Sequence, residues 1–441
     1  SAVREASNAD TFLDRLFMAT GVDVEVIDTS EESRLAVSAV RQALDGVPDA
    51  VEGKALIADV GGGSTLLTVL EDGEIVTSQG LQLGSIRLQE ALGTGYESPE
   101  RATEILTQQI ANAVAAVQSS LPMRGVRTFI AIGRAARFAA RHVGRPTGSP
   151  HLHVVTRGKF DRLLAQCQGQ SVEDLSRHFG LPYADAETLN PALLVYDQLM
   201  QAAHAKRMTV SDVSMRDGLL LDLARSVTGR EDKSIIKGVI RSATALAQKY
   251  HVDLPHARHV AFLAERLFDE LQSEHGLTSR HRLLLEVAGL VHEVGGFVSS
   301  RAHHKHSFYL ISNSEIFGLT REELTVVAHV SRYHRRGLPK PTHLEYMSLP
   351  RETRMVISKL SALLRVADAL DRGHSGHVGQ LWCERQGEEL VVNIPRVADL
   401  TLERRAMTMK GDLFDEIYGM RVRLEEAPGT GADERRARAV E

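Results

Sequence analysis

The chain has 441 residues and a formal net charge of −5, and hydrophobic residues make up 43% of it. This length exceeds one compact core, so we expect two to four domains. The mild acidity excludes a general affinity for nucleic acid or for membrane surfaces, so any polyanion needs a local basic patch. The only cysteines, Cys167 and Cys383, indicate a reducing cytoplasm rather than a disulfide framework. No apolar run reaches the roughly 18 residues of a membrane span.

The first 44 residues predict a helix, a short strand and a second helix. Apolar residues recur on one helical face over residues 8–20. The alternation in "DVEVIDTS" predicts a strand over residues 23–30, and two acids open a helix over residues 31–44. Because the chain begins without Met and at once with an amphipathic helix, we expect it to be a fragment of a longer protein.

Strands precede helices in the next part of the chain. Asp72-Gly73 is typical of a hairpin turn. Helical patterns dominate from Arg134 to about residue 226. Strands first and helices later, with crossovers, are typical of an α/β layer fold. The other predicted elements are strands over residues 55–60, 66–81 (the hairpin) and 126–133, and a helix near residues 98–120.

The pattern of polar and apolar residues changes twice more along the chain. Residues 226–234 are polar and charged, which predicts a linker. The pattern is then almost wholly helical to about residue 372 and carries most of the histidines. Alternation predicts a hairpin over residues 381–395 and a last strand over residues 418–427, and the remaining tail predicts disorder.

Three segments carry residues suited to phosphate chemistry. In "LIADVGGGSTLLTVL", Asp59 closes a strand and a glycine turn follows it. Such a turn offers backbone N–H groups and hydroxyls to an anion. Arg4 lies near the start, and Glu31 and Glu32 open a helix. A guanidinium, a carboxylate at a helix start and an N–H cradle suit phosphoanhydride hydrolysis, with the carboxylate accepting a proton from the attacking water.

The order and wording of these segments resemble the exopolyphosphatase/guanosine pentaphosphate phosphohydrolase (Ppx/GppA) family. The resemblance covers residues 1 to about 225 and includes "SAVREASNADTFLDRL", "ALIADVGGGSTLL" and "QLGSIRL". It implies an α/β ribonuclease-H-like (actin-like ATPase superfamily) domain whose N-terminal half-domain is truncated here. An all-α HD-like domain and a small α+β C-terminal region are expected to follow. The implied division is residues 1–35 (first domain remnant), 36–226, 234–374, 375–426 and 427–441 (tail).

The resemblance also implies residue roles. Glu32 matches the catalytic general base, Asp59 the acid associated with catalytic magnesium, and Arg4 a phosphate-binding arginine. The implied reaction releases terminal phosphate from inorganic polyphosphate or guanosine pentaphosphate, and the implied assembly is a homodimer. The other residues that match phosphate-binding positions are Gly61, Gly62, Gly63, Ser64, Thr65, Gly84 and Ser85.

The chain departs from the family pattern in ways that bear on catalysis. Leu66 stands where a second glutamate is usual, and Arg134 stands where a second glycine is expected after Gly133. The family's opening strand, with its own phosphate loop, is absent. These departures favour an alternative, in which the protein binds polyphosphate or an alarmone without hydrolysing it and signals through the helical half.

Histidines and acids in the helical half resemble the HD phosphohydrolase superfamily, whose members bind a divalent metal. Matching by motif gives His256, then His292 with Glu293 in the place of Asp, and Asp368. Either these residues bind a metal and the helical half is itself a phosphohydrolase, or the histidines are hydrogen-bonded core residues.

A basic run follows in "SRYHRRGLPKP", with Arg332, Arg335, Arg336 and Lys340. It is either a solvated helix end or the wall of a polyphosphate channel. In the second case, polyphosphate binding falls steeply with salt.

Overall fold

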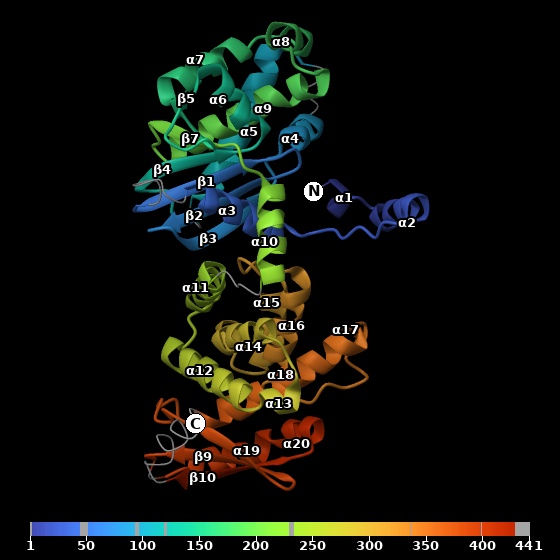
Figure 1. Ribbon diagram of the computed structural model, residues 1–441, viewed down its shortest axis with the longest axis vertical. Coiled ribbons are helices and arrows are strands. Elements are labelled where there is room, and N and C mark those ends of the chain that lie inside the picture. The colour runs from blue at the N-terminus through green and yellow to red at the C-terminus, as the bar shows by residue number, and fades with distance from the viewer. Residues whose placement is uncertain are drawn as a thin grey trace. The chain divides into compact units, whose positions relative to one another are not determined.

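The computed structural model describes residues 2–44, 52–92, 97–118, 121–228, 233–335, 337–397 and 399–427. It divides the chain into two compact units, residues 1–238 (unit 1) and residues 239–441 (unit 2). Figure 1 shows a sheet flanked by helices in unit 1, whereas unit 2 is mainly helical. The boundary lies within helix α11 (Lys233–Lys249).

Unit 1 is built on a seven-stranded mixed sheet in the order β3-β2-β1-β4-β7-β6-β5. β2 is antiparallel to both β1 and β3, whereas β1, β4 and β7 are parallel. The expected α/β class is confirmed. The strands are β1 (Lys54–Val60), β2 (Thr65–Glu71), β3 (Glu74–Leu81), β4 (Val126–Ile132), β5 (Arg145–Pro146), β6 (Leu152–Thr156) and β7 (Arg207–Ser211).

Helices cover both faces of this sheet. One face packs against α3, on which α10 packs in turn, and the other buries residues such as Leu56, Leu67 and Phe129 against the helices from α5 to α9. Apolar residues therefore occupy both faces of the central strands, as expected for a sheet buried on both sides. The helices of unit 1 are α1 (Ala2–Glu5), α2 (Ala9–Thr20), α3 (Thr29–Leu44), α4 (Ser85–Leu92), α5 (Pro99–Val117), α6 (Arg134–Val143), α7 (Arg157–Cys167), α8 (Val172–Phe179), α9 (Tyr183–Ala202) and α10 (Met215–Thr228).

Most predicted elements of unit 1 are confirmed. The turn between β2 and β3 has positive φ at Asp72 (50°) and Gly73 (77°), which a two-residue hairpin of this type requires. Helix α3 runs without a break across the expected boundary at residue 35. The predicted linker is partly helical, because α10 continues to Thr228 and α11 begins at Lys233; residues between them lie outside the described part of the chain.

Two predictions about strands are wrong. Residues 23–28 form no strand, and Val22, Val24 and Val26 are exposed. Alternation alone does not make a strand, because a strand also needs a neighbour to receive its hydrogen bonds. Conversely, β6 and β7 lie in the part predicted to be helical. They are short strands placed by pairing with each other and with β4, a long-range effect that local patterns do not record.

Unit 2 has a helical core and a small sheet. Helices α12, α14, α16 and α18 pack on one another, and β9 pairs with antiparallel β8 and parallel β10. The expected hairpin and last strand are confirmed; the tail beyond residue 427 lies outside the described residues. The elements are α12 (Leu254–Glu270), α13 (Gln272–His275), α14 (Ser279–Val291), η2 (Val294–Phe297), α15 (His303–Ser312), α16 (Arg321–Arg332), α17 (Leu344–Met347), α18 (Arg351–Leu370), β8 (Trp382–Gln386), β9 (Glu389–Pro395), α19 (Thr401–Lys410), α20 (Asp412–Tyr418) and β10 (Arg421–Ala427).

No helix among the described residues is both long enough and apolar enough to cross a membrane.

Candidate functional site

Unit 1 contains a pocket of about 540 Å³ at the carboxyl ends of its parallel strands. Asp59 and Val60 reach it from β1, Ile132 from β4, and Ser214 from the segment after β7. Ligands of α/β sheets bind at such carboxyl ends, where helix N-termini also converge. The first turns of α3, α4, α6 and α10 all contribute lining residues, so the unit 1 pocket gathers several positive dipole ends.

Glu32 enters the unit 1 pocket from the first turn of α3. Its neighbour Ser33 is buried, and the hydroxyls of Ser33, Thr68 and Ser78 are hydrogen-bonded to one another at 2.7 to 3.2 Å. This buried triangle joins α3 to β2 and β3. A fully paired polar network of this kind holds an element rigidly, so the direction of Glu32 is defined by the sheet.

An ion-pair network also joins α3 to α10. Arg34 binds both carboxylate oxygens of Glu31 (2.6 and 2.7 Å) and also pairs with Asp222 of α10. Glu31 is therefore occupied by a structural ion pair, which leaves Glu32 as the acid of this turn that faces the pocket.

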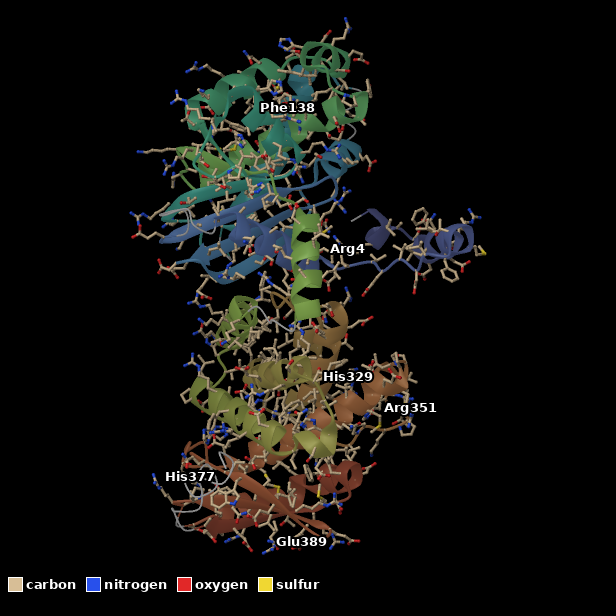
Figure 2. The ribbon with its side chains drawn as sticks, in the orientation of Figure 1. Arg4, Phe138, His329, Arg351, His377 and Glu389 are labelled. Carbon is tan, nitrogen blue, oxygen red and sulfur yellow. The ribbon has the colours of Figure 1, made fainter. Side chains whose placement is uncertain are left out.

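Arg4 lies beside Glu32. Its guanidinium donates to Glu32 Oε2 at 3.4 Å and to the carbonyl oxygen of Ile27 at 3.0 Å. Arg4, labelled in Figure 2, does not line the pocket itself. The expected pair of a phosphate-binding cation and a catalytic acid is thus brought into contact, with Glu32 nearer to the pocket.

Asp59 is the second pocket acid. Burial and the nearby Glu32 charge raise the pKa of Asp59 to about 6, although Arg137 lowers it in part. Mutual repulsion of this kind requires the two carboxyl groups to be close. Tyr196 fixes the strand ends behind them: its hydroxyl donates to the carbonyl oxygen of Ile132 and accepts from Val60 N–H (3.4 Å).

The glycine turn is closed by its own bonds. Gly61 N–H donates to Ser64 O (3.0 Å), and the start of α4 donates to the turn through Ser85 N–H to Gly61 O (3.0 Å). A Cβ on Gly84 would lie 2.2 Å from Gly62 O, so only glycine allows this approach. Within the described chain no hydrogen bond uses the N–H groups of Gly62 or Gly63, which leaves these donors for an anion.

The structure places only some of the expected phosphate-binding residues in the pocket wall. Gly61, Gly62 and Ser85 line it together with Glu32 and Asp59. Thr65 is fully buried, and its hydroxyl donates to Leu83 O (2.7 Å), which is a supporting contact. The expected residues that do not line the pocket are Arg4, Gly63, Ser64, Thr65 and Gly84.

The two departures from the family pattern have different surroundings. Leu66 is buried in β2 directly opposite Asp59 in the β1–β2 register. Arg134 is the first residue of α6 and forms an ion pair with Asp185 of α9. It follows Gly133, whose φ is 115° and where a Cβ would lie 2.7 Å from Val60 O. The strand therefore still ends on a glycine, and Arg134 adds a charge at the pocket.

Sequence reasoning missed several pocket residues. Arg137 and Arg141 line the pocket from α6, and Tyr196 lies behind it. The i, i+3, i+7 spacing of Arg134, Arg137 and Arg141 was a usable signal, because it places three guanidinium groups on one helical face.

The donor chemistry of the pocket fits magnesium. Mg²⁺ is usually held by one or two carboxylates together with substrate phosphates, and Asp59 with the nearby Glu32 supplies that number. The two groups of three clustered ligand-type side chains among the described residues lie elsewhere, in unit 2.

In unit 2 the structure brings together His256, His292 and Asp368, whose ligand-type atoms lie within 4.8 Å of one another. His256 Nδ1 donates to Asp371 Oδ2 and His292 Nδ1 donates to Gly289 O, both at 2.7 Å. Among the described residues, the buried Nε2 atom of each imidazole has no hydrogen-bond partner. Metal-binding histidines are commonly oriented in this way, so these residues fit a divalent cation.

Lys410 is an unexpected member of this cluster. Its buried ammonium group binds Asp368 Oδ2, whereas Asp368 Oδ1 faces His256 Nε2 at 3.8 Å. Although burial opposes it, this ammonium group holds the pKa of Asp368 well below its ordinary value. Burial lowers the pKa of His292, which favours the neutral imidazole that a metal requires. Lys410 thus supplies part of the positive charge that a metal would supply.

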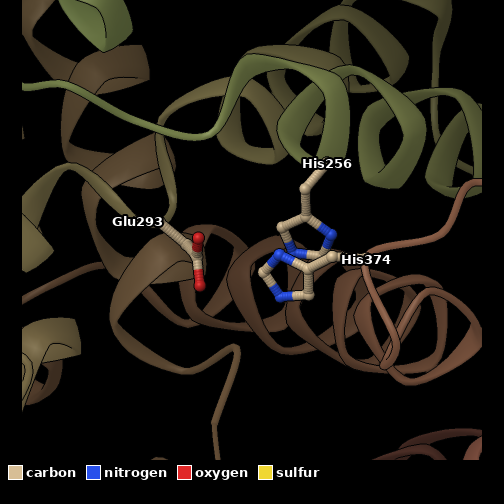
Figure 3. Close-up of side chains that lie close together, drawn as sticks. All are labelled: His256, Glu293 and His374. Carbon is tan, nitrogen blue, oxygen red and sulfur yellow. The ribbon is translucent and has the colours of Figure 1, made fainter.

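Glu293 belongs to a second, overlapping group. It lies near His256 and His374, as Figure 3 shows, again within 4.8 Å. The rings of His256 and His374 stack with centroids 3.6 Å apart. His374 comes from the segment after α18, and the sequence motifs did not point to it. The four expected ligands therefore divide into two sets that share His256.

The basic run is partly engaged within unit 2. Arg332 lies over the ring of Phe308 (4.9 Å) and pairs with Glu345 at 3.6 Å. Arg336 lies outside the described residues.

Comparisons with known proteins identify the family of the chain. A model of the Ppx/GppA phosphatase family matches residues 1–227, and a model of Ppx/GppA phosphatase domain III matches residues 240–410. The guanosine-5'-triphosphate,3'-diphosphate pyrophosphatase of Photobacterium profundum is 23% identical over 368 residues, covering 83% of this chain and 69% of that protein. That of Aeromonas hydrophila subsp. hydrophila is 24% identical over 401 residues, covering 90% and 77%.

Solved structures are similar over about half of the chain. The crystal structure of an exopolyphosphatase from Cytophaga hutchinsonii has a TM-score of 0.46 and 22% identity, covering 52% of this chain and 74% of that one. An Aquifex aeolicus member of the Ppx/GppA family has a TM-score of 0.42 and 22% identity, covering 51% and 72%. The family model over residues 1–227 spans more than half of the sequence. The chain belongs to the Ppx/GppA phosphatase family.

Proposed function

We propose that unit 1 releases the terminal phosphate of inorganic polyphosphate or guanosine pentaphosphate. The observation that carries the proposal is the meeting of Glu32 and Asp59 in one pocket, beside unpaired N–H groups of the glycine turn and several guanidinium groups. The family and the names of the relatives, which include a pyrophosphatase of guanosine pentaphosphate and an exopolyphosphatase, support this substrate class.

The geometry suggests how the residues divide the work. Glu32 accepts a proton as water attacks the terminal phosphorus, and the bond to the bridging oxygen then breaks. Arg4 pairs with the Glu32 carboxylate and helps to position it. The N–H group of Gly62, which lines the pocket, is a donor for the charge that develops on the phosphoryl oxygens. Magnesium held by Asp59 would neutralise part of this charge when bound.

A comparison of Glu32 in unit 1 with His292 in unit 2 tests this assignment. We expect wild-type protein to release phosphate from polyphosphate or guanosine pentaphosphate, Glu32→Gln to lose about 10²-fold or more of the rate, and His292→Ala to retain it. Loss of phosphate release in His292→Ala but not in Glu32→Gln would assign the activity to unit 2. Tight binding without any release by wild-type protein would favour the binding-only alternative, which Leu66 and Arg134 also favour.

We propose as a second function that unit 2 binds a divalent metal through His256, His292 and Asp368. The two orphaned Nε2 atoms support it, whereas the Lys410 ammonium group competes for Asp368. Lys410→Met should therefore tighten Mn²⁺ or Zn²⁺ binding at least tenfold in calorimetry. It should also lower the melting temperature in EDTA, because it leaves Asp368 buried without a partner. Unchanged metal affinity would contradict the proposal.

A homodimeric state and a cytoplasmic location remain proposals. The first rests on the family resemblance and is measured by light scattering coupled to size-exclusion chromatography. The second rests on the two cysteines, which are both free.

A further inference from the structure

One face of α6 is a row of arginines that the family motifs do not include. Arg134, Arg137 and Arg141 follow at i, i+3 and i+7, and all three line the unit 1 pocket. The other side of the helix is buried and is made largely of alanine. Phe138, labelled in Figure 2, is buried among these alanines. The helix therefore separates an apolar face from a cationic face that is directed at the pocket.

The local electrostatics of α6 oppose this arrangement unless an anion is present. The first turn holds Arg134 and Arg137 but no acid, and the N-cap residue Gly133 has no side chain to accept a hydrogen bond. Cations at a helix N-terminus are unfavourable, because the helix dipole is already positive there. A segment that breaks a local rule in this way commonly does so for function. An anionic ligand would satisfy both the dipole and the guanidinium groups.

The acids of the pocket neutralise only Arg134 in this row by direct pairing. Asp185 pairs with Arg134, and Glu32 pairs with Arg4. Arg137 is close enough to Asp59 to lower its pKa. Among the residues that the structure describes, however, the guanidinium group of neither Arg137 nor Arg141 makes a hydrogen bond or an ion pair. Two guanidinium groups thus remain for a ligand in a pocket whose volume admits more than one phosphate group.

We propose that Arg137 and Arg141 form a subsite for the phosphate groups that follow the reacting one, so that the pocket selects linear oligophosphates. The inference rests on the proposed function, because the reacting phosphate is placed at Glu32 and Asp59. Arg137 is one helical turn from that end of the pocket and Arg141 is a turn farther, and the row extends about 10 Å at 1.5 Å per residue. Guanidinium groups bind phosphate oxygens in pairs of parallel hydrogen bonds, which suits a chain of phosphates.

The test separates binding from turnover. Dissociation constants for tripolyphosphate, long-chain inorganic polyphosphate and guanosine pentaphosphate are measured by calorimetry, with Glu32→Gln in every protein so that no ligand is consumed. Arg141→Gln is expected to weaken binding of the long chain about tenfold or more, since a hydrogen bond between charged groups contributes this much. Tripolyphosphate binding should change less than threefold. Arg145→Gln on exposed β5, outside the pocket, is the matched control and should change neither.

Salt dependence provides a second readout that a purely structural role would not change. The slope of log affinity against log salt should fall by about one in Arg141→Gln and in Arg137→Gln, because each variant loses one phosphate contact. Loss confined to the inorganic chain identifies polyphosphate as the ligand, and loss for both ligands shows that the subsite also accepts the nucleotide. Long-chain affinity and slope that match the Arg145→Gln control would overturn the subsite.

Phosphate release is measured separately on protein that keeps Glu32. This measurement distinguishes failure of this inference from failure of the proposed function. If release requires Glu32 but the arginine variants bind like the control, the function stands and the subsite is wrong. If the arginine variants lose long-chain binding although wild-type protein releases no phosphate, the subsite stands and the hydrolytic function is wrong.

Discussion

At the scale of single residues, Leu66 bears on the proposed hydrolysis because it occupies the position beside Asp59 where a second carboxylate is expected. It lies opposite Asp59 in the antiparallel β1–β2 pair, and directly opposite residues point to the same face of a sheet. A carboxylate at position 66 would therefore lie beside Asp59. The side chain is only 4% exposed, so the leucine stabilises the sheet at the place where the family resemblance leads us to expect an acid.

Leu66→Glu should make phosphate release more dependent on magnesium. It should also make the folded protein less stable when magnesium is absent. The new carboxylate would add an oxygen ligand next to Asp59, which Mg²⁺ prefers. Without a cation it would be a buried charge that costs about 2 kcal/mol or more of unfolding free energy. The measurement is phosphate release across a magnesium titration, together with thermal melting in EDTA. Leu66→Gln is the control of the same shape, and an equal response of both variants would contradict this account.

The site residues differ in how far the sequence predicts them. Glu32 and Asp59 lie in local motifs, at a helix start and a strand end, so their chemistry is visible in the order of residues. Arg141 and Lys410 are brought into their sites by tertiary packing, which no local motif records. Thr65 fits the motif, but its hydroxyl bonds to Leu83 within the supporting turn.

At the scale of elements, helices α12 and α14 are joined by an acid pair that responds to pH. Glu286 of α14 lies beside Glu265 of α12, which also pairs with Arg282. Burial, followed by the Glu265 charge, raises the pKa of Glu286 to about 7. The protonated form is therefore favoured in the folded state. Its contribution to stability is fully present below the ordinary pKa of glutamate and is lost as pH rises through about 7.

Glu286→Gln should remove this pH dependence. The amide stays neutral, so at pH 8 we expect the variant to exceed wild-type protein by about 1 to 2 kcal/mol in unfolding free energy, after allowance for solvent screening. At pH 4.5 the two should agree. Urea unfolding at both pH values is the measurement, with Glu416→Gln on the exposed side of α20 as control. Parallel stability curves for the two proteins would show that Glu286 does not carry the proton.

The elements themselves were predictable where one residue pattern decides them. The β2–β3 hairpin and helix α3 depend on a turn dipeptide and on helical periodicity, and both are confirmed. Residues 23–28 alternate like a strand but find no partner among the described residues, whereas β6 and β7 form because strands distant in sequence pair with them. Pairing partners, unlike periodicity, are not encoded within a short segment.

At the scale of the whole molecule, each unit carries its own cluster of ionisable groups. Unit 1 combines two carboxylates with a cationic pocket wall, which suits an anionic substrate. Unit 2 buries histidines and Asp368 around Lys410, which suits a cation or an internal charge balance. The family models match both parts of the chain, and the residues of unit 1 suit the proposed hydrolysis better than those of unit 2 do.

The most direct test of the central claim compares the adjacent acids Glu32 and Glu31. Phosphate release and polyphosphate affinity are measured on wild-type protein, Glu32→Gln and Glu31→Gln. Because Glu32 faces the pocket and Glu31 is engaged by Arg34, we predict that Glu32→Gln binds polyphosphate within about threefold of wild type and loses release by 10²-fold or more. Glu31→Gln should keep both. Equal rates in the two variants would contradict the assignment of Glu32 as the base that activates water.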